Sequence, residues 1–313
     1  MSHALPHTEI DVLVDCDTGL DDALALMLLF RVPGVRVHAV TCVNGNVGVD
    51  HVTRNTLSVL DVIGAPDVPV ARGCPQPLAS ERVDASWIHG EAGLGTVVLP
   101  ESDRKLVPQH AVELMRSTLM EAESPRTLIA LGPLTNLAVL FTAHPEVKDK
   151  IERLIVMGGS AAAGGNDDAA AEFNFFADPE AADIVLRAGI ETVMYGLDVF
   201  NRLALSKDDV AQLAASTDPA AQLASQLLVG YNLLGDAGAV ATALWPDGAE
   251  TAKHPTVVEL AGKYTRGMSL VDRRPADRRG PHEDRTRPEI NITWEVDQPL
   301  YVSRFLAAVT SQG

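Results

Sequence analysis

Apolar positions along the chain form short runs that alternate with stretches of helical spacing. The first run, 12–14, ends at a group of aspartates, and an apolar helical pattern over 23–28 follows at once. We expect further strands at 35–43, 67–71, 127–131, 153–159, 191–199, 256–262, 264–272 and 290–296, and further helices at 48–63, at 108–121, from 133, at 178–189, twice within 207–245, and at 298–310. Repeated strand–helix units predict an α/β fold with an open, mostly parallel, Rossmann-like sheet flanked by helices.

No internal repeat and no linker interrupts this order, so we expect a single domain over residues 1–313. Residues 1–10 are expected to be flexible. The stretch 272–288 is rich in Arg, Asp and Pro and predicts a mobile, solvated loop. A longer segment, 72–106, shows no regular pattern and predicts an irregular connection.

Composition narrows the kinds of partner that the chain can bind. Acidic residues exceed basic ones by 42 to 25, which gives a net charge of −17 and argues against binding to nucleic acid. The three cysteines lack metal-type spacing, as is typical of a reducing compartment. The first residues resemble no signal peptide, and no apolar stretch is long enough to span a membrane. We therefore expect a cytoplasmic protein.

Four aspartates lie at the junction between the first predicted strand and helix: Asp15, Asp17, Asp21 and Asp22. One or two acids there would be ordinary helix caps, because helix N-termini favour anions. Four within eight residues repel one another unless a cation lies among them or some are protonated. Crowded oxygen ligands suit calcium or magnesium. An EF-hand does not fit, because position twelve of such a loop is Leu26.

Other polar residues also follow predicted strands. In an open parallel sheet the carboxyl ends of the strands share one edge, where ligands bind. We therefore expect one crevice that is built from residues far apart in the sequence. These are the aspartates after the first strand, Asn46 after the second, His89 after the third, Thr135 and Asn136 after the fourth, and Met157 with a glycine-rich loop after the fifth.

The loop after the fifth strand carries Asn166, Glu172 and Asn174. Amides beside a carboxylate suit the hydroxyls of a sugar better than a phosphate, which favours Arg, Lys or a cradle of N–H groups. The simpler interpretation is that Asn166 and Asn174 are turn residues, and this is strongest for Asn166, which follows two glycines.

Taken together, the motifs resemble those of the nucleoside hydrolase family, of the inosine–uridine-preferring type, from residue 11 to the last predicted helix. They are DCDTGLDD (15–22), GN (45–46), HGEAGLG (89–95), ALGPLTNLA (130–138), VMGG (156–159), AEFNFFADPEAA (171–182) and TRGMSLVD (265–272). The resemblance implies calcium-dependent hydrolysis of the N-glycosidic bond of ribonucleosides to ribose and free base. It also implies a homodimer or homotetramer.

Position by position, the resemblance implies a role for each site residue. The implied calcium ligands are Asp17, Asp22, the backbone carbonyl of Thr135, and Asp236 in GDAGAVA (235–241). Asp17 is also implied to activate the attacking water. The residues implied to hold the ribose are Asp21, Asn46, Glu172 and Asn174, with Asn166 on the 5′ side and Met157 lining the sugar pocket.

The chain departs from the family pattern at Gly235, where these enzymes typically carry a histidine before the last metal aspartate. His89 and Trp87 are the candidates for contact with the leaving base, and Tyr231 is a further one. For His89 a loop-stabilising role is an equal alternative. We expect a substrate with a reduced demand for acid catalysis, or a nonstandard nucleoside. On this hypothesis, Gly235→His raises the turnover of inosine.

Two alternatives use the same residues. Asp15 and Asp17 resemble the first motif of haloacid-dehalogenase-type phosphatases, although no downstream lysine and acid pair follows. The chain would alternatively be a calcium-bound nucleoside- or ribose-binding protein that is catalytically impaired by the missing histidine.

Overall fold

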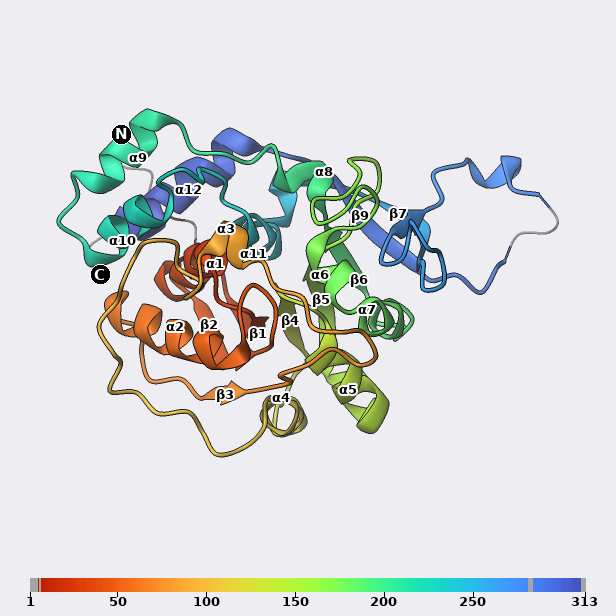
Figure 1. Cartoon of the computed structure of the whole chain (residues 1–313), viewed down its shortest axis with the longest axis horizontal. Coiled ribbons are helices and arrows are strands. Elements are labelled where there is room, and N and C mark those ends of the chain that lie inside the picture. The colour runs from red at the N-terminus through yellow and green to blue at the C-terminus, as the bar shows by residue number, and fades with distance from the viewer. Residues whose placement is uncertain (1–4, 6, 281–283, 311–313) are drawn as a thin grey trace.

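The computed structural model describes residues 5, 7–280 and 284–310 (Figure 1). Within this part, nine strands follow the order β3-β2-β1-β4-β5-β6-β9-β7-β8. All neighbouring pairs from β3 to β9 are parallel, whereas β7 pairs antiparallel with both β9 and β8. The strands are β1 Ile10–Cys16, β2 Val35–Cys42, β3 Val70–Arg72, β4 Arg126–Ala130, β5 Ile151–Met157, β6 Thr192–Tyr195, β7 Ala249–Val258, β8 Ser269–Val271 and β9 Glu289–Val296. The predicted α/β fold with an open, mostly parallel sheet is confirmed.

Helices cover both faces of this sheet. The α-helices are α1 Leu20–Arg31, α2 Val49–Val62, α3 Ser86–His89, α4 Ala111–Met120, α5 Thr135–Ala143, α6 Phe173–Ala177, α7 Pro179–Leu186, α8 Leu197–Phe200, α9 Lys207–Ala214, α10 Pro219–Leu227, α11 Asp236–Leu244 and α12 Gln298–Thr310. The described part of the chain also contains three short 3-10 helices, η1 Pro145–Lys150, η2 Pro246–Gly248 and η3 Ala276–Arg278. Helices α1, α2, α10, α11 and α12 pack on one face, and α4, α5 and α7 pack on the other.

The central strands are apolar on both faces because they are buried between these two helical layers. In β1, Val12 and Val14 belong to the core beneath α1, whereas Leu13 belongs to the core beneath α4 and α5. In β4, Ile129 joins the first core and Leu128 the second. This alternation follows from the period of two along a strand. It explains why these segments read as continuous apolar runs in the sequence.

Several predicted boundaries were wrong. Three helices rather than two lie within 207–245, because Asp218 caps a separate helix, α10, with its side chain accepting the N–H of Ala220. Strand β7 begins at Ala249 instead of 256, since its first half is exposed and carries no apolar alternation. Strand β3 covers 70–72, and the irregular segment 72–106 contains the short helix α3.

The two segments that the sequence predicts to be flexible, 1–10 and 272–288, lie only partly within the described residues. Residues 1–4 and 6 lie outside them, and Ile10 already belongs to β1. The predicted loop at 272–288 contains η3 and two ion pairs of Asp272, with Arg274 and Arg287. Residues 281–283 of that loop lie outside the described residues. Among the helices described, none is both long and apolar enough to cross a membrane.

The sheet places the carboxyl ends of its parallel strands in register. Cys16 at the end of β1 pairs with Cys42 at the end of β2, and Met157 at the end of β5 pairs with Tyr195 at the end of β6. The segments that follow β1, β2, β4, β5 and β6 therefore leave the sheet along one edge, as the sequence predicts for a ligand-binding crevice.

Candidate active site

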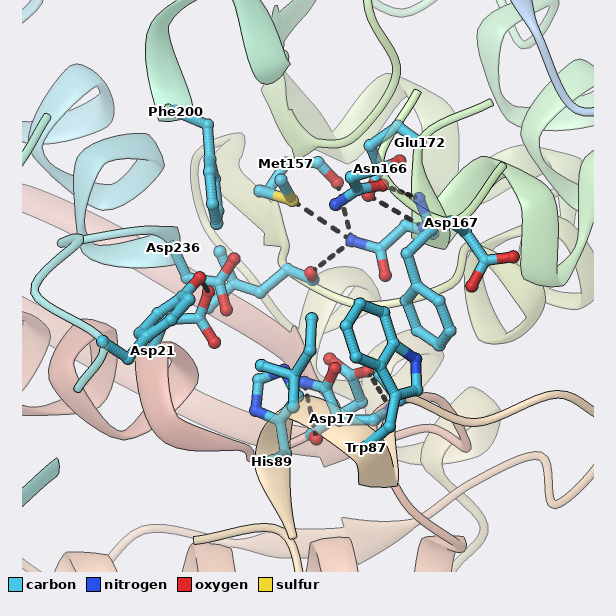
Figure 2. A pocket seen from close by; sticks show the side chains of 17 residues that line it. Asp17, Asp21, Trp87, His89, Met157, Asn166, Asp167, Glu172, Phe200 and Asp236 are labelled. Carbon is cyan, nitrogen blue, oxygen red and sulfur yellow. Dashed lines mark hydrogen bonds between the residues drawn. The ribbon is translucent and has the colours of Figure 1, made fainter. Parts of the chain in front are cut away.

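A pocket of about 490 Å³ lies at this edge of the sheet (Figure 2). The predicted site residues that line it are Asp17, Asp21, Asn46, Trp87, His89, Met157, Asn166, Glu172, Asn174 and Asp236. Of the predicted set, Asp22 and Thr135 do not line the pocket. The structure therefore brings together residues from five separate connections, while the role of each stays a prediction.

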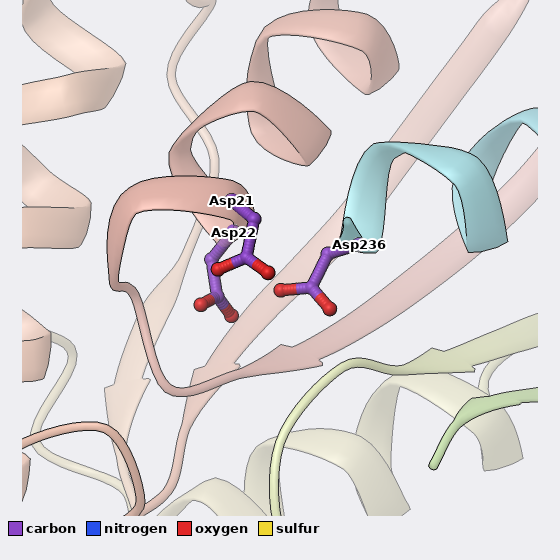
Figure 3. Close-up of side chains that lie close together, drawn as sticks. All are labelled: Asp21, Asp22 and Asp236. Atoms are coloured by element: carbon purple, nitrogen blue, oxygen red, sulfur yellow. The ribbon is translucent and has the colours of Figure 1, made fainter. Parts of the chain in front are cut away.

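Three carboxylates meet at one end of the pocket (Figure 3). Asp21 and Asp22 lie in the first turn of α1, and Asp236 begins α11. One oxygen from each lies within 4.8 Å of the others, and all three residues are buried. This group includes Asp21, which the sequence places on the ribose, and it does not include Asp17 or Thr135.

Asp22 is held in place by the loop that precedes its helix. Its Oδ1 accepts the N–H of Asp17 at 3.1 Å, and its Oδ2 accepts the N–H of Gly19 at 2.9 Å. The side-chain amide of Asn46 donates to the same Oδ2 at 3.1 Å. These bonds close the turn between β1 and α1 and connect it to the end of β2.

Asp17 has one satisfied and one unsatisfied oxygen. Its Oδ2 accepts the backbone N–H of Asn46 at 2.7 Å, whereas its Oδ1 is buried without a hydrogen-bond partner. A Cβ on Gly45 or on Gly132 would overlap the Asp17 carboxylate, so glycine is needed on both sides. A buried carboxylate oxygen without a partner is costly. Asp15 Oδ2 is also buried without a partner, but only Asp17 of the two lines the pocket, where a bound ligand can supply one.

The acids of this end of the pocket raise one another's pKa. Burial, together with the neighbouring charge of Asp22, raises the pKa of Asp17 well above its usual range. Burial and the charges of Asp21, Asp22 and Asp17 do the same for Asp236. Burial raises the pKa of Asp21 to about 6. A bound cation would offset both the burial and the repulsion, and an all-oxygen donor set fits a hard divalent ion.

Thr135 and Asp15 do not line the pocket, and their side chains form hydrogen bonds to neighbouring segments. The Thr135 hydroxyl donates to Asp178 at 2.6 Å, which leaves only its backbone carbonyl for the predicted role as a ligand. Asp15 accepts hydrogen bonds from Thr41 at 2.6 Å and from the Asn136 amide at 2.8 Å. Burial raises the pKa of Asp15 to about 7. These contacts, and its absence from the pocket lining, give Asp15 a supporting structural role.

Glu172 and Asn174 lie at the start of α6 and are tied to the backbone. Glu172 caps the helix: its Oε1 accepts the N–H of Asn174 at 2.9 Å, and its Oε2 accepts those of Gly159 at 2.8 Å and Phe175 at 3.2 Å. The amide of Asn174 donates to the carbonyls of Leu131, at 2.7 Å, and of the residue ending β5, at 3.1 Å. A carboxylate has about four acceptor positions, so Glu172 retains one for a ligand.

Glu172 makes a testable contribution to the pH dependence of stability. Burial raises its pKa from 4.5 to about 7 against the opposing effect of its three backbone donors. Between these values the folded protein holds a proton that the unfolded chain releases, so this contribution is complete below pH 4.5 and is lost as the pH rises through 7. Urea unfolding without added metal, from pH 5 to 8, is expected to show wild type losing on the order of 2 to 3 kcal/mol more than Glu172→Gln. Parallel profiles would contradict this assignment.

His89 and Trp87 both come from α3 but differ in exposure. His89 is buried, and its Nδ1 accepts the N–H of Leu20 at 3.1 Å. The proton of the neutral ring therefore lies on Nε2. Burial lowers the pKa of His89 to about 4. Trp87 is 71% exposed at the pocket. His89 thus stabilises the start of α1 and also lines the pocket, while its contact with the leaving base stays a prediction.

Gly235 has a conformation that the sequence does not reveal. Its φ of +51° and ψ of −121° fall in a region that residues with a Cβ rarely adopt. A Cβ at this position would also overlap the side chain of Asp21. The structure therefore leaves no room for a histidine side chain at position 235 without a shift of Asp21, while the expected rise in inosine turnover stays a prediction.

Sequence reasoning did not select some residues that line the pocket, namely Phe200, Phe173 and Asp167. Phe200 ends α8, directly after β6, and its ring points into the pocket in Figure 2. The sequence analysis selected polar residues that follow strands, so it could not identify an aromatic side chain in this position. Tyr231, an open candidate from the sequence, also lines the pocket, and its hydroxyl donates to Asp21 at 3.4 Å.

Comparisons with known proteins agree with this geometry. A family model described as inosine-uridine preferring nucleoside hydrolase matches residues 12–303. The pyrimidine-specific ribonucleoside hydrolase RihA of Salmonella schwarzengrund is 39% identical over 276 residues, which cover 84% of this chain and 88% of that protein. A plant nucleoside hydrolase, PpNRh1, has a similar structure with a TM-score of 0.90 and 27% identity, covering 98% of this chain and 100% of its own.

A further solved structure has a different base preference in its name. The purine-preferring ribonucleoside hydrolase from Gardnerella vaginalis has a TM-score of 0.86 and 28% identity, covering 96% of this chain and 98% of its own. All of these names describe nucleoside hydrolases, but the names do not share one base preference. The family match extends over nearly the whole chain, from the first aspartates to the last helix. The chain therefore belongs to the inosine-uridine preferring nucleoside hydrolase family, whose members are N-glycosyl hydrolases.

Proposed function

We propose that this protein hydrolyses the N-glycosidic bond of ribonucleosides to ribose and free base, and that it depends on Ca²⁺. The observation that supports this most is the pairing of two kinds of group in one pocket. A buried carboxylate oxygen of Asp17 without a partner lines the pocket, and so do Asn166, Glu172 and Asn174. Figure 2 shows Asn166 and Glu172 apart from Asp17 across the pocket. The first group suits a cation and water, and the second suits sugar hydroxyls.

The ion would be held by Asp17, Asp22, Asp236 and the carbonyl of Thr135. Once bound, it would fix the ribose hydroxyls and lower the pKa of the attacking water. The proximity of Asp21 to Asp22 and Asp236 makes Asp21 a further ligand candidate beside its proposed role on the ribose. The oxygen-only donor set favours a hard cation of the Ca²⁺ or Mg²⁺ kind.

Asp17 is the proposed general base. The N–H of Asn46 holds its Oδ2, so that its Oδ1 is left to accept a proton from water. As the glycosidic bond breaks, positive charge develops on the ribose ring. The surrounding carboxylates stabilise this charge in a buried site, where fixed charges act strongly. Water then adds to the face opposite the leaving base.

His89 is the proposed contact for the leaving base. Because its Nδ1 accepts the N–H of Leu20, only Nε2 carries a proton that can be donated to a base atom. A neutral imidazole stabilises negative charge on the base by hydrogen bonding and is a weak proton donor. Trp87 is proposed to stack on the base from the exposed side of the pocket.

Ribose release from a panel of purine and pyrimidine ribonucleosides tests this function. With Ca²⁺ present, a reducing-sugar assay is expected to show turnover of at least one nucleoside. Excess chelator should remove at least about 99% of it, since the ion fixes both substrate and water. Re-addition of Ca²⁺ should restore activity, and Mg²⁺ should restore less of it because its octahedral geometry is stricter.

Two outcomes would overturn the proposal. Ribose release that persists in chelator would exclude the role of the ion. Binding of nucleosides without any release would instead establish the catalytically impaired binding protein, which the glycine at position 235 makes a real competitor. The match to a nucleoside hydrolase family sets aside the phosphatase alternative.

The location and the assembly are proposed as well. We propose a cytoplasmic protein, in keeping with three cysteines that are all free in the structure. We also propose a homodimer or homotetramer, as the family resemblance implies. Light scattering after size-exclusion chromatography measures the assembly.

A further inference from the structure

The pocket is acidic at both ends. Asp21 and Asp236 lie at one end, and Glu172 and Asp167 lie at the other (Figure 2). Asp17 is the fifth carboxylate that lines it. In the described part of the chain, no lysine or arginine lines the pocket. Burial leaves Glu172 partly protonated near pH 7, and one divalent cation offsets two of the charges that the four lining aspartates carry once it is bound. The pocket therefore stays net negative and favours a ligand with positive charge.

The base side of the pocket offers hydrogen-bond donors but no strong proton donor. Position 235 is a glycine, and its backbone and contact with Asp21 exclude a side chain there. His89 uses Nδ1 to accept the N–H of Leu20, so it presents a neutral ring to the pocket. The hydroxyl of Tyr231 is already bonded to Asp21. These groups are therefore poor proton donors to a base that must be protonated before it can leave.

Aromatic rings also line the pocket. Phe173, Phe200, Tyr231 and the exposed Trp87 all line the pocket. Faces of such rings attract cationic heterocycles through the ring quadrupole, and Trp does so best. The exposure of Trp87 leaves a ring face available at the mouth of the pocket.

We propose that the substrates this site is built for include nucleosides whose base carries a fixed positive charge, namely N-ribosylated pyridinium or N7-alkylated purine ribonucleosides. This inference rests on the proposed function and names its substrate class. Water adds to C1′, and the C1′–N bond breaks with its electron pair passing to the ring nitrogen. The base leaves as a neutral molecule without a proton, and the proton of the water passes to Asp17 and then to solvent. The reaction therefore needs no acid at position 235.

The test compares matched substrates on the wild-type protein with Ca²⁺. N7-methylguanosine is compared with guanosine, and N-ribosylated nicotinamide with uridine. The cationic member of each pair is expected to have a kcat/KM at least about tenfold higher. Its kcat/KM should also fall as ionic strength rises from 20 to 500 mM, to a degree that the neutral member does not show, because salt screens the attraction. A more labile bond alone would raise kcat without this salt dependence.

Asp167 provides a second readout, because it lines the pocket but holds neither the ion nor the attacking water in the proposed mechanism. Asp167→Asn is expected to raise KM for the cationic substrates about threefold or more and to leave KM for guanosine and uridine within about twofold. Glu91→Gln is the matched control: Glu91 is exposed in the neighbouring loop and does not line the pocket. It should leave both values unchanged.

The outcomes separate this inference from the function on which it rests. Chelator-sensitive cleavage of guanosine or uridine with a lower kcat/KM for the cationic partners would overturn the inference and keep the proposed function. Equal salt dependence within each pair would also overturn it. No cleavage of any of the four substrates would overturn the proposed function itself.

Discussion

Replacement of Asp17 by asparagine is expected to lower kcat for ribonucleoside hydrolysis by about 10³-fold, while the protein stays folded. The oxygen that matters is Oδ1, which is buried without a hydrogen-bond partner. Asparagine keeps the shape of the side chain and can still accept the N–H of Asn46 through its remaining oxygen. It cannot take a proton from water, and it contributes no charge to the proposed cation site.

The stability of this variant distinguishes a lost base from a damaged fold. Burial and repulsion by Asp22 and Asp21 raise the pKa of Asp17, so its charge opposes folding when no cation is bound. In chelator, Asp17→Asn should therefore melt at the same temperature as wild type or higher. Wild type should gain thermal stability with Ca²⁺ by the linkage between binding and folding, and the variant should lose most of this gain.

Asp15→Asn is the matched control, since Asp15 lies two positions earlier and is equally buried. Asp15 is bonded to Thr41 and Asn136 and does not line the pocket. Its substitution is expected to leave the melting temperature nearly unchanged and to retain at least about a tenth of kcat, because asparagine keeps an oxygen that can accept both bonds and no reacting group is lost. Equal losses of kcat in the two variants, or full activity in Asp17→Asn, would show that Asp17 is not the base.

The part of the site that is local in sequence could be predicted from the sequence. Asp17, Asp21 and Asp22 lie within a single strand–helix junction, and the period of the apolar residues on either side fixes where that junction lies. The order of alternating strands and helices then fixes which connections share an edge of the sheet. Asn46 and Met157 could be assigned to the pocket on that basis alone, and the structure places both there.

Features that depend on contacts between distant segments could not be predicted in this way. The sequence shows Glu172 as an acid near two asparagines, whereas the structure shows that it caps α6 and binds three backbone N–H groups. Phe200 was missed because an aromatic residue after a strand is usually core. For Gly235 the sequence shows that a side chain is missing, but it carries no information on the sign of φ or on the proximity of Asp21.

Gly235 therefore supports a prediction opposite to the one that the sequence favours. Gly235→His is expected to destabilise the protein by about 3 to 5 kcal/mol and to lower, not raise, the turnover of inosine. Two causes combine. The backbone conformation is unfavourable for a residue with a Cβ, and the Cβ would displace the side chain of Asp21 from the group that it forms with Asp22 and Asp236.

Gly64→His separates these two causes. Gly64 also has a positive φ, +64°, but a Cβ there meets nothing within 4 Å. This control should lose only the conformational part, about 1 to 2 kcal/mol, and should keep normal activity. Urea unfolding of both variants, together with inosine turnover and Ca²⁺ affinity, gives the comparison.

The result for Gly235→His decides what the glycine means. If the variant were as stable as wild type and faster on inosine, then the glycine would be a simple loss of the family's acid. The proposal of a substrate that needs no acid would then fail as well. If the variant instead loses stability, Ca²⁺ affinity and turnover together, then Gly235 is part of the way this site is built, because the close approach of α11 to Asp21 requires a residue without a side chain.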